Sequence, residues 1–245
     1  MPSLSIDNLE INYEISGEGP LLILHHGFGS WGKDWHVGGW IYAFEPSFSV
    51  LAFDAVGHGK STRSHDPVDQ TIERRADVVR ALADSQSAEK FAFLGFSLGG
   101  RTGFELAASS PERINALAIG GMQMLPPSVE QQKYERRIRV LRSGRAKSIE
   151  QPVGERPGND PKALAASHEA LIQWQGVDGR LGNFSAPTML FCGDKDPYFE
   201  NAESSSREFG FQFEKLEGVD HDAAFFESKL AVEKTVRFFE SHLVS

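Results

Sequence analysis

The stretch Gly95-Phe96-Ser97-Leu98-Gly99-Gly100 decides how this chain is interpreted. It follows the apolar run 91–94 and precedes the helix-like run 101–109, a pattern that predicts a strand, a sharp turn and a helix. Such a turn strains the backbone of Ser97, and the glycines two residues to either side remove side chains that would collide. The hydroxyl then projects at a helix N-terminus, which favours negative charge. This is the geometry of a nucleophile, although a glycine-rich turn in an unrelated α/β protein can have the same sequence pattern.

The bulk properties are those of a globular protein. The chain has 245 residues, of which 40% are hydrophobic and 24% charged, so we expect one domain with an insertion. The formal net charge of -9 argues against binding to nucleic acid or to an anionic membrane. No segment reaches membrane-spanning length, no signal-like N-terminal segment is present, and one cysteine fits a reducing compartment. We therefore expect a cytoplasmic location.

Apolar runs of strand length recur along the chain and alternate with helix-length segments. The runs lie at 21–24, 49–53, 91–94, 116–119 and 188–192. The segment 71–83 between two of them has apolar residues at helical spacing. This alternation predicts a mostly parallel sheet that binds ligands beyond the carboxyl ends of its strands. The segment 9–15 alternates apolar and polar residues, which predicts an antiparallel edge strand.

The alternation fails between Gly121 and Ala186, and helices replace strands there. The segment 129–147 reads as one helix, the Pro- and Gly-rich segment 151–158 breaks it, and a second helix starts at Pro161 and runs to about residue 175. We expect two or three helices to cover the active edge of the sheet as a lid.

The first lid helix carries an excess of positive charge. Its basic residues are Lys133, Arg136, Arg137, Arg139, Arg142, Arg145 and Lys147, against Glu135 in the same span. A solvated helix face is the favoured interpretation, and attraction of an anionic substrate is the alternative. For His168, on the second lid helix, a packed or rim position is favoured over contact with substrate.

Two residues late in the chain complete the chemistry of Ser97. Asp196 follows the strand 188–192 in a glycine turn, and His221 follows the strand-like segment 211–216. The chain order Ser97, Asp196, His221 is one known order of a nucleophilic triad. His221 would take the proton of Ser97, and Asp196 would orient the imidazole. Asp194 is the reserve for Asp196.

A second loop supplies a candidate for the oxyanion hole. The stretch His26-Gly27-Phe28-Gly29 follows the first buried strand, and the backbone N–H of Phe28 would act with that of Leu98. For His26 we expect a hydrogen-bonding role that shapes this loop. Asp54 is expected to hydrogen-bond neighbouring backbone N–H groups, and His58, between two glycines, is expected to be exposed.

With these motifs assembled, the sequence resembles the α/β-hydrolase family over essentially its whole length. The resemblance implies an α/β-hydrolase fold, with an eight-stranded, mostly parallel sheet and a helical cap between the sixth and seventh strands. It also implies cofactor-free hydrolysis through an acyl-enzyme, without a metal. The predicted division is a core of residues 1–121 and 186–245 and a cap of residues 122–185. Val56 departs from the pattern, since many relatives carry arginine there.

The expected function is that of a serine hydrolase acting on small to medium carboxylic esters or lactones through an acyl-enzyme on Ser97. A carbon–carbon bond hydrolase or perhydrolase of the same fold is an alternative, because substrate choice lies outside the turn. A ligand receptor that retains the triad is an alternative of another class. The expected partner is a small molecule, with no nucleic acid and no membrane. Several aromatic residues are candidates for an acyl pocket or for the core: Phe28, Trp31, Trp35, Trp40 and Trp174.

Overall fold

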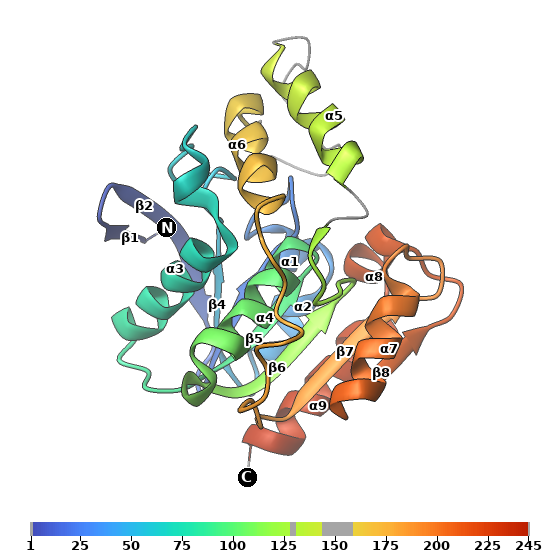
Figure 1. Ribbon diagram of the computed structural model, residues 1–245. Helices are drawn as coiled ribbons and strands as arrows, with labels where there is room; N and C mark the ends of the chain where they lie inside the picture. The colour runs from blue at the N-terminus through green and yellow to red at the C-terminus, as the bar shows by residue number, and fades with distance from the viewer. Residues whose placement is uncertain (1, 128–130, 144–158, 245) are drawn as a thin grey trace.

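The computed structural model describes residues 2–127, 131–143 and 159–244. Within these residues, eight strands form one sheet in the order β1-β2-β4-β3-β5-β6-β7-β8 (Figure 1). The strands are β1 (Ser3–Ile6), β2 (Leu9–Ser16), β3 (Leu21–His25), β4 (Ser49–Phe53), β5 (Phe91–Phe96), β6 (Ile114–Gly120), β7 (Thr188–Gly193) and β8 (Gln212–Leu216). The helices are α1 (Asp34–Val37), α2 (Trp40–Phe44), α3 (Ile72–Ser85), α4 (Leu98–Ser109), α5 (Gln131–Arg142), α6 (Pro161–Leu171), α7 (Phe199–Phe209), α8 (His221–Phe226) and α9 (Lys229–Leu243), with 3₁₀ turns at Pro67–Gln70 and Pro111–Arg113.

The strand pairing confirms a mostly parallel sheet. All pairs from β4 across to β8 are parallel, whereas β1–β2 and β2–β4 are antiparallel. The prediction that the segment 9–15 forms an edge strand is wrong, because β2 lies between β1 and β4 and β1 takes the edge. The strand β1 has only four residues and is largely exposed or half-buried, so it pairs through its backbone without an apolar run.

Helices cover both faces of the sheet, and the central strands contribute to a core on each face. On β5, Phe91 and Phe93 pack in the core that includes α3 and α4. Ala92 and Leu94 point the other way, into the core that includes Trp40 of α2 and Phe239 of α9. Burial on both faces explains why the central strands read as continuous apolar runs rather than as alternating ones.

Helices α5 and α6 lie between β6 and β7 in the chain and stand at one end of the sheet, at the top of Figure 1. The described part of the predicted helix 129–147 is helical over Gln131–Arg142; its residues 129–130 and 144–147, and the predicted break at 151–158, lie outside the described residues. At the start of α6 the side chain of Asp160 accepts a hydrogen bond from the Lys162 N–H at 2.8 Å, and Pro161 occupies the first turn.

The helix α6 ends at Leu171, earlier than the residue 175 that the sequence predicts. In the part of the chain that the structure describes, no helix has the length and apolar character needed to cross a membrane.

Candidate active site

Ser97 lies in a strained turn between β5 and α4. Its φ of 54° and ψ of -109° are rare for a residue with a side chain. A Cβ added at Gly95 would lie 2.2 Å from the Gly99 carbonyl oxygen, and one at Gly99 would lie 2.0 Å from the His25 oxygen. Both positions therefore require glycine. The Ser97 N–H donates to the Gly120 carbonyl at 2.9 Å, which anchors the turn to β6.

The structure brings Ser97, His221 and Asp196 into one line of hydrogen bonds. His221 Nε2 lies 3.0 Å from Ser97 Oγ, and His221 Nδ1 lies 2.6 Å from Asp196 Oδ2. The carboxylate can only accept, so Nδ1 carries the proton and Nε2 is left to accept from the serine hydroxyl. Asp220 caps α8 by accepting from the Ala223 N–H at 2.9 Å, which places His221 at the start of that helix.

The two candidate aspartates after β7 have different surroundings. The other oxygen of Asp196 accepts from the Tyr198 N–H at 2.9 Å, and the residue is 5% exposed. Asp194 instead accepts from the Gly218 N–H at 2.8 Å, so the structure does not bring the reserve candidate to His221.

Burial, followed by the neighbouring Asp196 carboxylate, raises the pKa of the Cys192 thiol, which stays protonated in the core.

The two candidate oxyanion donors lie beside Ser97. Leu98 is the first residue of α4, so its N–H has no acceptor within the helix. A Cβ added at Gly27 would lie 3.3 Å from the Ser97 Cβ, which shows how closely the loop that carries Phe28 approaches the serine. Phe28, Leu98, Ser97 and His221 line the same pocket.

His26 and Asp54 hold the loops behind this pocket. His26 Nε2 accepts from the Ala55 N–H at 3.0 Å, and its Nδ1 lies 2.7 Å from the Gly27 carbonyl oxygen. Asp54 accepts from the N–H groups of Gly32 at 2.7 Å and Lys60 at 2.8 Å. Burial raises the pKa of Asp54, and these hydrogen bonds oppose that effect. Both residues therefore have the loop-shaping contacts that their sequence context predicts.

The prediction that His58 is exposed is wrong. His58 is fully buried, with its ring edge-on to those of His26 and Phe28. Burial lowers its pKa well below the usual value, so the ring is neutral. The side chain of Asn159, just before α6, donates to the Gly29 carbonyl at 2.7 Å and accepts from the Gly59 N–H at 3.4 Å. The rings that pack against His58 come from another loop, so the local Gly-His-Gly pattern carries no sign of this burial.

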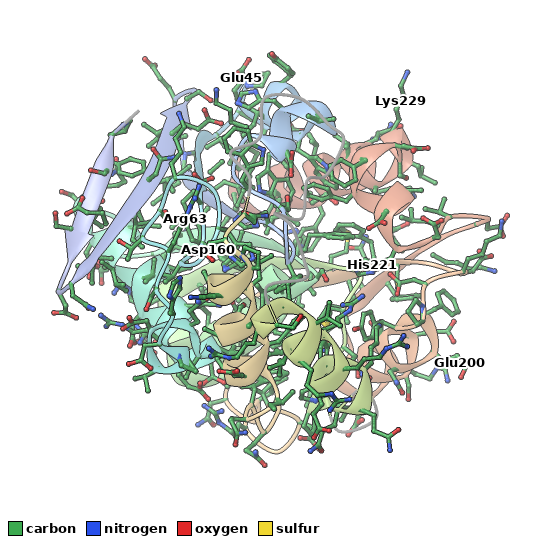
Figure 2. The ribbon with its side chains drawn as sticks, turned by 90° about the horizontal axis from the view of Figure 1, so that it is seen from above. Glu45, Arg63, Asp160, Glu200, His221 and Lys229 are labelled. Carbon is green, nitrogen blue, oxygen red and sulfur yellow. The ribbon has the colours of Figure 1, made fainter. Side chains whose placement is uncertain are left out.

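The pocket at this site has a volume of about 840 Å³ and mixes apolar and basic side chains. Of the five aromatic residues considered for an acyl pocket, Phe28 lines it among the described residues, whereas Trp35, Trp40 and Trp174 are core residues. The described lining comprises Phe28, Gly29, Ser97, Leu98, Arg101, Met122, Lys133, Tyr134, Arg136, Arg137, Val140, Leu141, His168, Leu171, Pro197, Tyr198, His221 and Asp222. Figure 2 views the molecule from above and labels His221, which lines this pocket together with residues of α5.

Several lining residues were not found by sequence reasoning, including Arg101, Met122 and Tyr198. A signal existed for Arg101, because it lies four residues after Ser97 and so shares a face of α4. Its guanidinium carbon lies 5.7 Å from the Trp174 ring centroid and 6.0 Å from that of Tyr198. Met122 and Tyr198 come from loops whose positions depend on the fold.

Comparison with known proteins places this architecture in a family. The family model described as the alpha/beta hydrolase fold matches residues 20–145, just over half of the 245 residues. A pimeloyl-acyl-carrier-protein methyl ester esterase from Vibrio campbellii is 34% identical over 107 residues, which span 44% of this chain and 39% of that protein. The match to that relative therefore covers less than half of its length.

Two further comparisons extend over most of the chain. A proposed carbamate hydrolase from Yersinia enterocolitica is 30% identical over 210 residues, which cover 75% of this chain and 74% of that protein. The solved structure of a thermophilic esterase from Thermogutta terrifontis superposes with a TM-score of 0.85 at 20% identity and covers 100% of both chains. The strained serine turn, the sheet order and these matches lead to one conclusion: the chain belongs to the α/β-hydrolase fold family.

Proposed function

We propose that the protein is a serine hydrolase that cleaves small to medium carboxylic esters or lactones through an acyl-enzyme on Ser97. The observation that carries this proposal is the hydrogen-bonded line from Ser97 Oγ through His221 to Asp196, opening into the pocket. The pocket volume of about 840 Å³ is suited to a small ligand. Membership of a family with hydrolase relatives supports the reaction class.

In the first half of the proposed reaction, Ser97 Oγ attacks the ester carbonyl carbon while its proton passes to His221 Nε2. The carbonyl oxygen becomes an oxyanion that accepts from the N–H groups of Phe28 and Leu98. Removal of one such donor in other enzymes costs about 3–4 kcal/mol of transition-state stabilisation. The tetrahedral intermediate collapses, the alkoxide leaves with the proton from His221, and the acyl group stays on Ser97.

In the second half, water takes the place of the alcohol. His221 Nε2 accepts a proton from the water as its oxygen attacks the acyl carbonyl, and collapse returns that proton to Ser97 Oγ and releases the acid. Asp196 holds the imidazole in the productive tautomer throughout. A lactone is a cyclic ester, so the same steps open its ring.

We also propose that residues 122–185 form a cap on a core of residues 1–121 and 186–245. The described lining contributed by α5 and α6 supports this division, because these helices bring Tyr134, Leu141 and His168 to the pocket that contains Ser97. The cap would then set substrate choice, while the core supplies the chemistry.

The test is steady-state hydrolysis of p-nitrophenyl acetate and butyrate. Ser97→Ala is expected to abolish turnover, and His221→Ala to lower kcat by much more than tenfold. Asp196→Asn and Asp194→Asn form a matched pair on the same loop. The first is expected to lower kcat by several orders of magnitude because the tautomer is lost, and the second to leave kcat within about threefold.

Three outcomes would contradict the proposal. Undiminished hydrolysis by Ser97→Ala would place the chemistry elsewhere. A single burst of p-nitrophenol followed by a stable adduct would instead indicate a ligand receptor that retains these residues. If esters react slowly and vinylogous diketones react quickly, the protein is a carbon–carbon bond hydrolase with the same nucleophile.

A further inference from the structure

The pocket at Ser97 is positively charged, although the chain as a whole carries a formal charge of -9. Four of its described lining residues are cationic, namely Arg101, Lys133, Arg136 and Arg137, and one, Asp222, is a carboxylate. A concave site lined by one sign of charge concentrates ligands of the opposite sign. This local reversal of charge therefore needs a ligand to explain it.

The basic residues of α5 fall into two groups. Lys133, Arg136 and Arg137 are spaced by three and four residues, share one face of the helix, and line the pocket. Arg139 is exposed outside the pocket lining, and Arg142 forms a two-pronged ion pair with Glu169 at 2.5 and 2.6 Å. All five of these side chains are exposed, as the solvated-face interpretation expects, and three of them also line the pocket that contains Ser97.

Arg136 and Arg137 are the cations in this pocket that the protein leaves to a ligand. In the portions 2–127, 131–143 and 159–244, no carboxylate lies within ion-pair distance of either guanidinium. Both side chains are exposed at the pocket rim, so each can reach an incoming anion. The planar guanidinium group matches a carboxylate with two parallel hydrogen bonds, a geometry that an ammonium group lacks.

His168 supplies a second, independent observation that points to a ligand. The residue is 1% exposed and lines the pocket, and neither ring nitrogen has a hydrogen-bond partner among the described residues. Its ring stacks on that of Phe28, with centroids 3.9 Å apart. Buried polar atoms are nearly always hydrogen-bonded in folded proteins. An unpartnered imidazole next to a candidate oxyanion residue therefore marks a position that a polar group of the substrate fills.

The charges on α5 act on this histidine directly. Burial first, then Arg137 and Lys133, lower the pKa of His168 to about 3. At neutral pH the ring is uncharged and offers one N–H donor and one acceptor. The cations and the neutral donor thus lie around one space, together with the apolar side chains of Met122, Val140 and Leu141 that suit a short methylene chain.

We propose that the preferred substrates are monoanionic esters, either half-esters of short dicarboxylic acids or carboxylate-bearing lactones, whose carboxylate is held by Arg136 and Arg137 with His168 donating to the bound substrate. This inference rests on the proposed function, since it names the substrate class for hydrolysis at Ser97. The ester carbonyl lies at Ser97 and the methylene chain along the apolar wall. The negative charge of the substrate is neutralised at the cap.

The kinetic test compares monomethyl adipate with its neutral isostere, the methyl ester of adipic acid monoamide, by pH-stat. The expected kcat/KM ratio is at least tenfold in favour of the half-ester, and it falls as NaCl is raised because salt screens the exposed guanidinium groups. In the double variant Arg136→Gln, Arg137→Gln the ratio is expected to fall toward one. Arg139→Gln, the matched control on the same helix, is expected to retain the wild-type ratio.

A binding measurement separates this inference from the proposed function. Calorimetric titration of Ser97→Ala with adipate needs no turnover, and binding that is lost in the arginine double variant supports the anion site even if no ester is hydrolysed. A half-ester ratio near one, or unchanged adipate binding in the double variant, would overturn the inference. Tighter binding of methyl phosphate than of adipate would overturn its assignment to carboxylates.

Discussion

Substitution of Gly95 by alanine tests whether the close approach of β5 and α4 holds the serine in place. An added Cβ would lie 2.2 Å from the Gly99 carbonyl oxygen and 2.4 Å from its carbon, both of them backbone atoms. A carbon–oxygen contact needs about 3.3 Å, so the strand and the helix must separate by roughly 1 Å. Close-packed interiors resist such a shift, and overpacking of this kind costs about 1–3 kcal/mol or more.

The same separation displaces Ser97, which links the two elements. Its hydroxyl lies 3.0 Å from His221 Nε2, and a 1 Å displacement removes that hydrogen bond. Misplacement of a reacting group by about 1 Å can lower the rate about 100-fold. We therefore expect Gly95→Ala to lose about 3 kcal/mol in the free energy of unfolding and about 100-fold in kcat. Urea unfolding followed by circular dichroism, and p-nitrophenyl butyrate hydrolysis, measure the two effects.

Gly103→Ala on α4 is the matched control. A Cβ there would lie 3.0 Å from Phe93 Cε1 and 3.2 Å from Leu117 Cδ1, which are side-chain atoms that can yield by a few tenths of an ångström. We expect a change of less than about 1.5 kcal/mol in stability and less than about threefold in kcat. If Gly95→Ala matched Gly103→Ala in kcat, the reasoning that this close approach positions the serine would be refuted.

Two further predictions concern buried groups around the site. The Glu105 side chain is 2% exposed and accepts from Arg180 at 2.6 and 3.0 Å, so Arg180→Ala is expected to cost about 3 kcal/mol by leaving a buried carboxylate without its cation. Arg142→Ala, at an exposed pair, should cost less than about 1 kcal/mol in the same urea experiment, and equal costs would contradict this reasoning. His168 has a folded-state pKa of about 3, against a usual value of 6.5, so below pH 6.5 the unfolded chain binds a proton that the folded chain does not. The contribution of His168 to the free energy of unfolding is therefore fully present above pH 6.5 and is lost as the pH falls toward 3, at up to about 1.4 kcal/mol per pH unit. In His168→Phe the free energy of unfolding should decline less steeply over the same pH range. Parallel declines in the two proteins would argue against a neutral buried His168.

Local chemistry was enough to predict the central part of the fold. Strands buried on both faces appear as continuous apolar runs, so the parallel strands could be located from hydropathy alone. The sequence did not reveal β1, because a short exposed strand held by backbone hydrogen bonds has no hydropathy pattern. The sequence pattern consequently placed the segment 9–15 at the edge of the sheet, whereas it forms the second strand from that edge.

The sequence by itself determined the strained serine turn, because only glycine at residues 95 and 99 permits so close an approach of strand and helix. It also favoured Asp196 over Asp194, and the structure places Asp196, not Asp194, beside His221. Tertiary structure alone decided which basic residues of α5 face Ser97 and that His168 lies unpartnered among them. The physical reason is the distance along the sequence over which the deciding interactions act. Turn geometry depends on adjacent residues, whereas the charge and burial of a pocket depend on groups that only folding brings together.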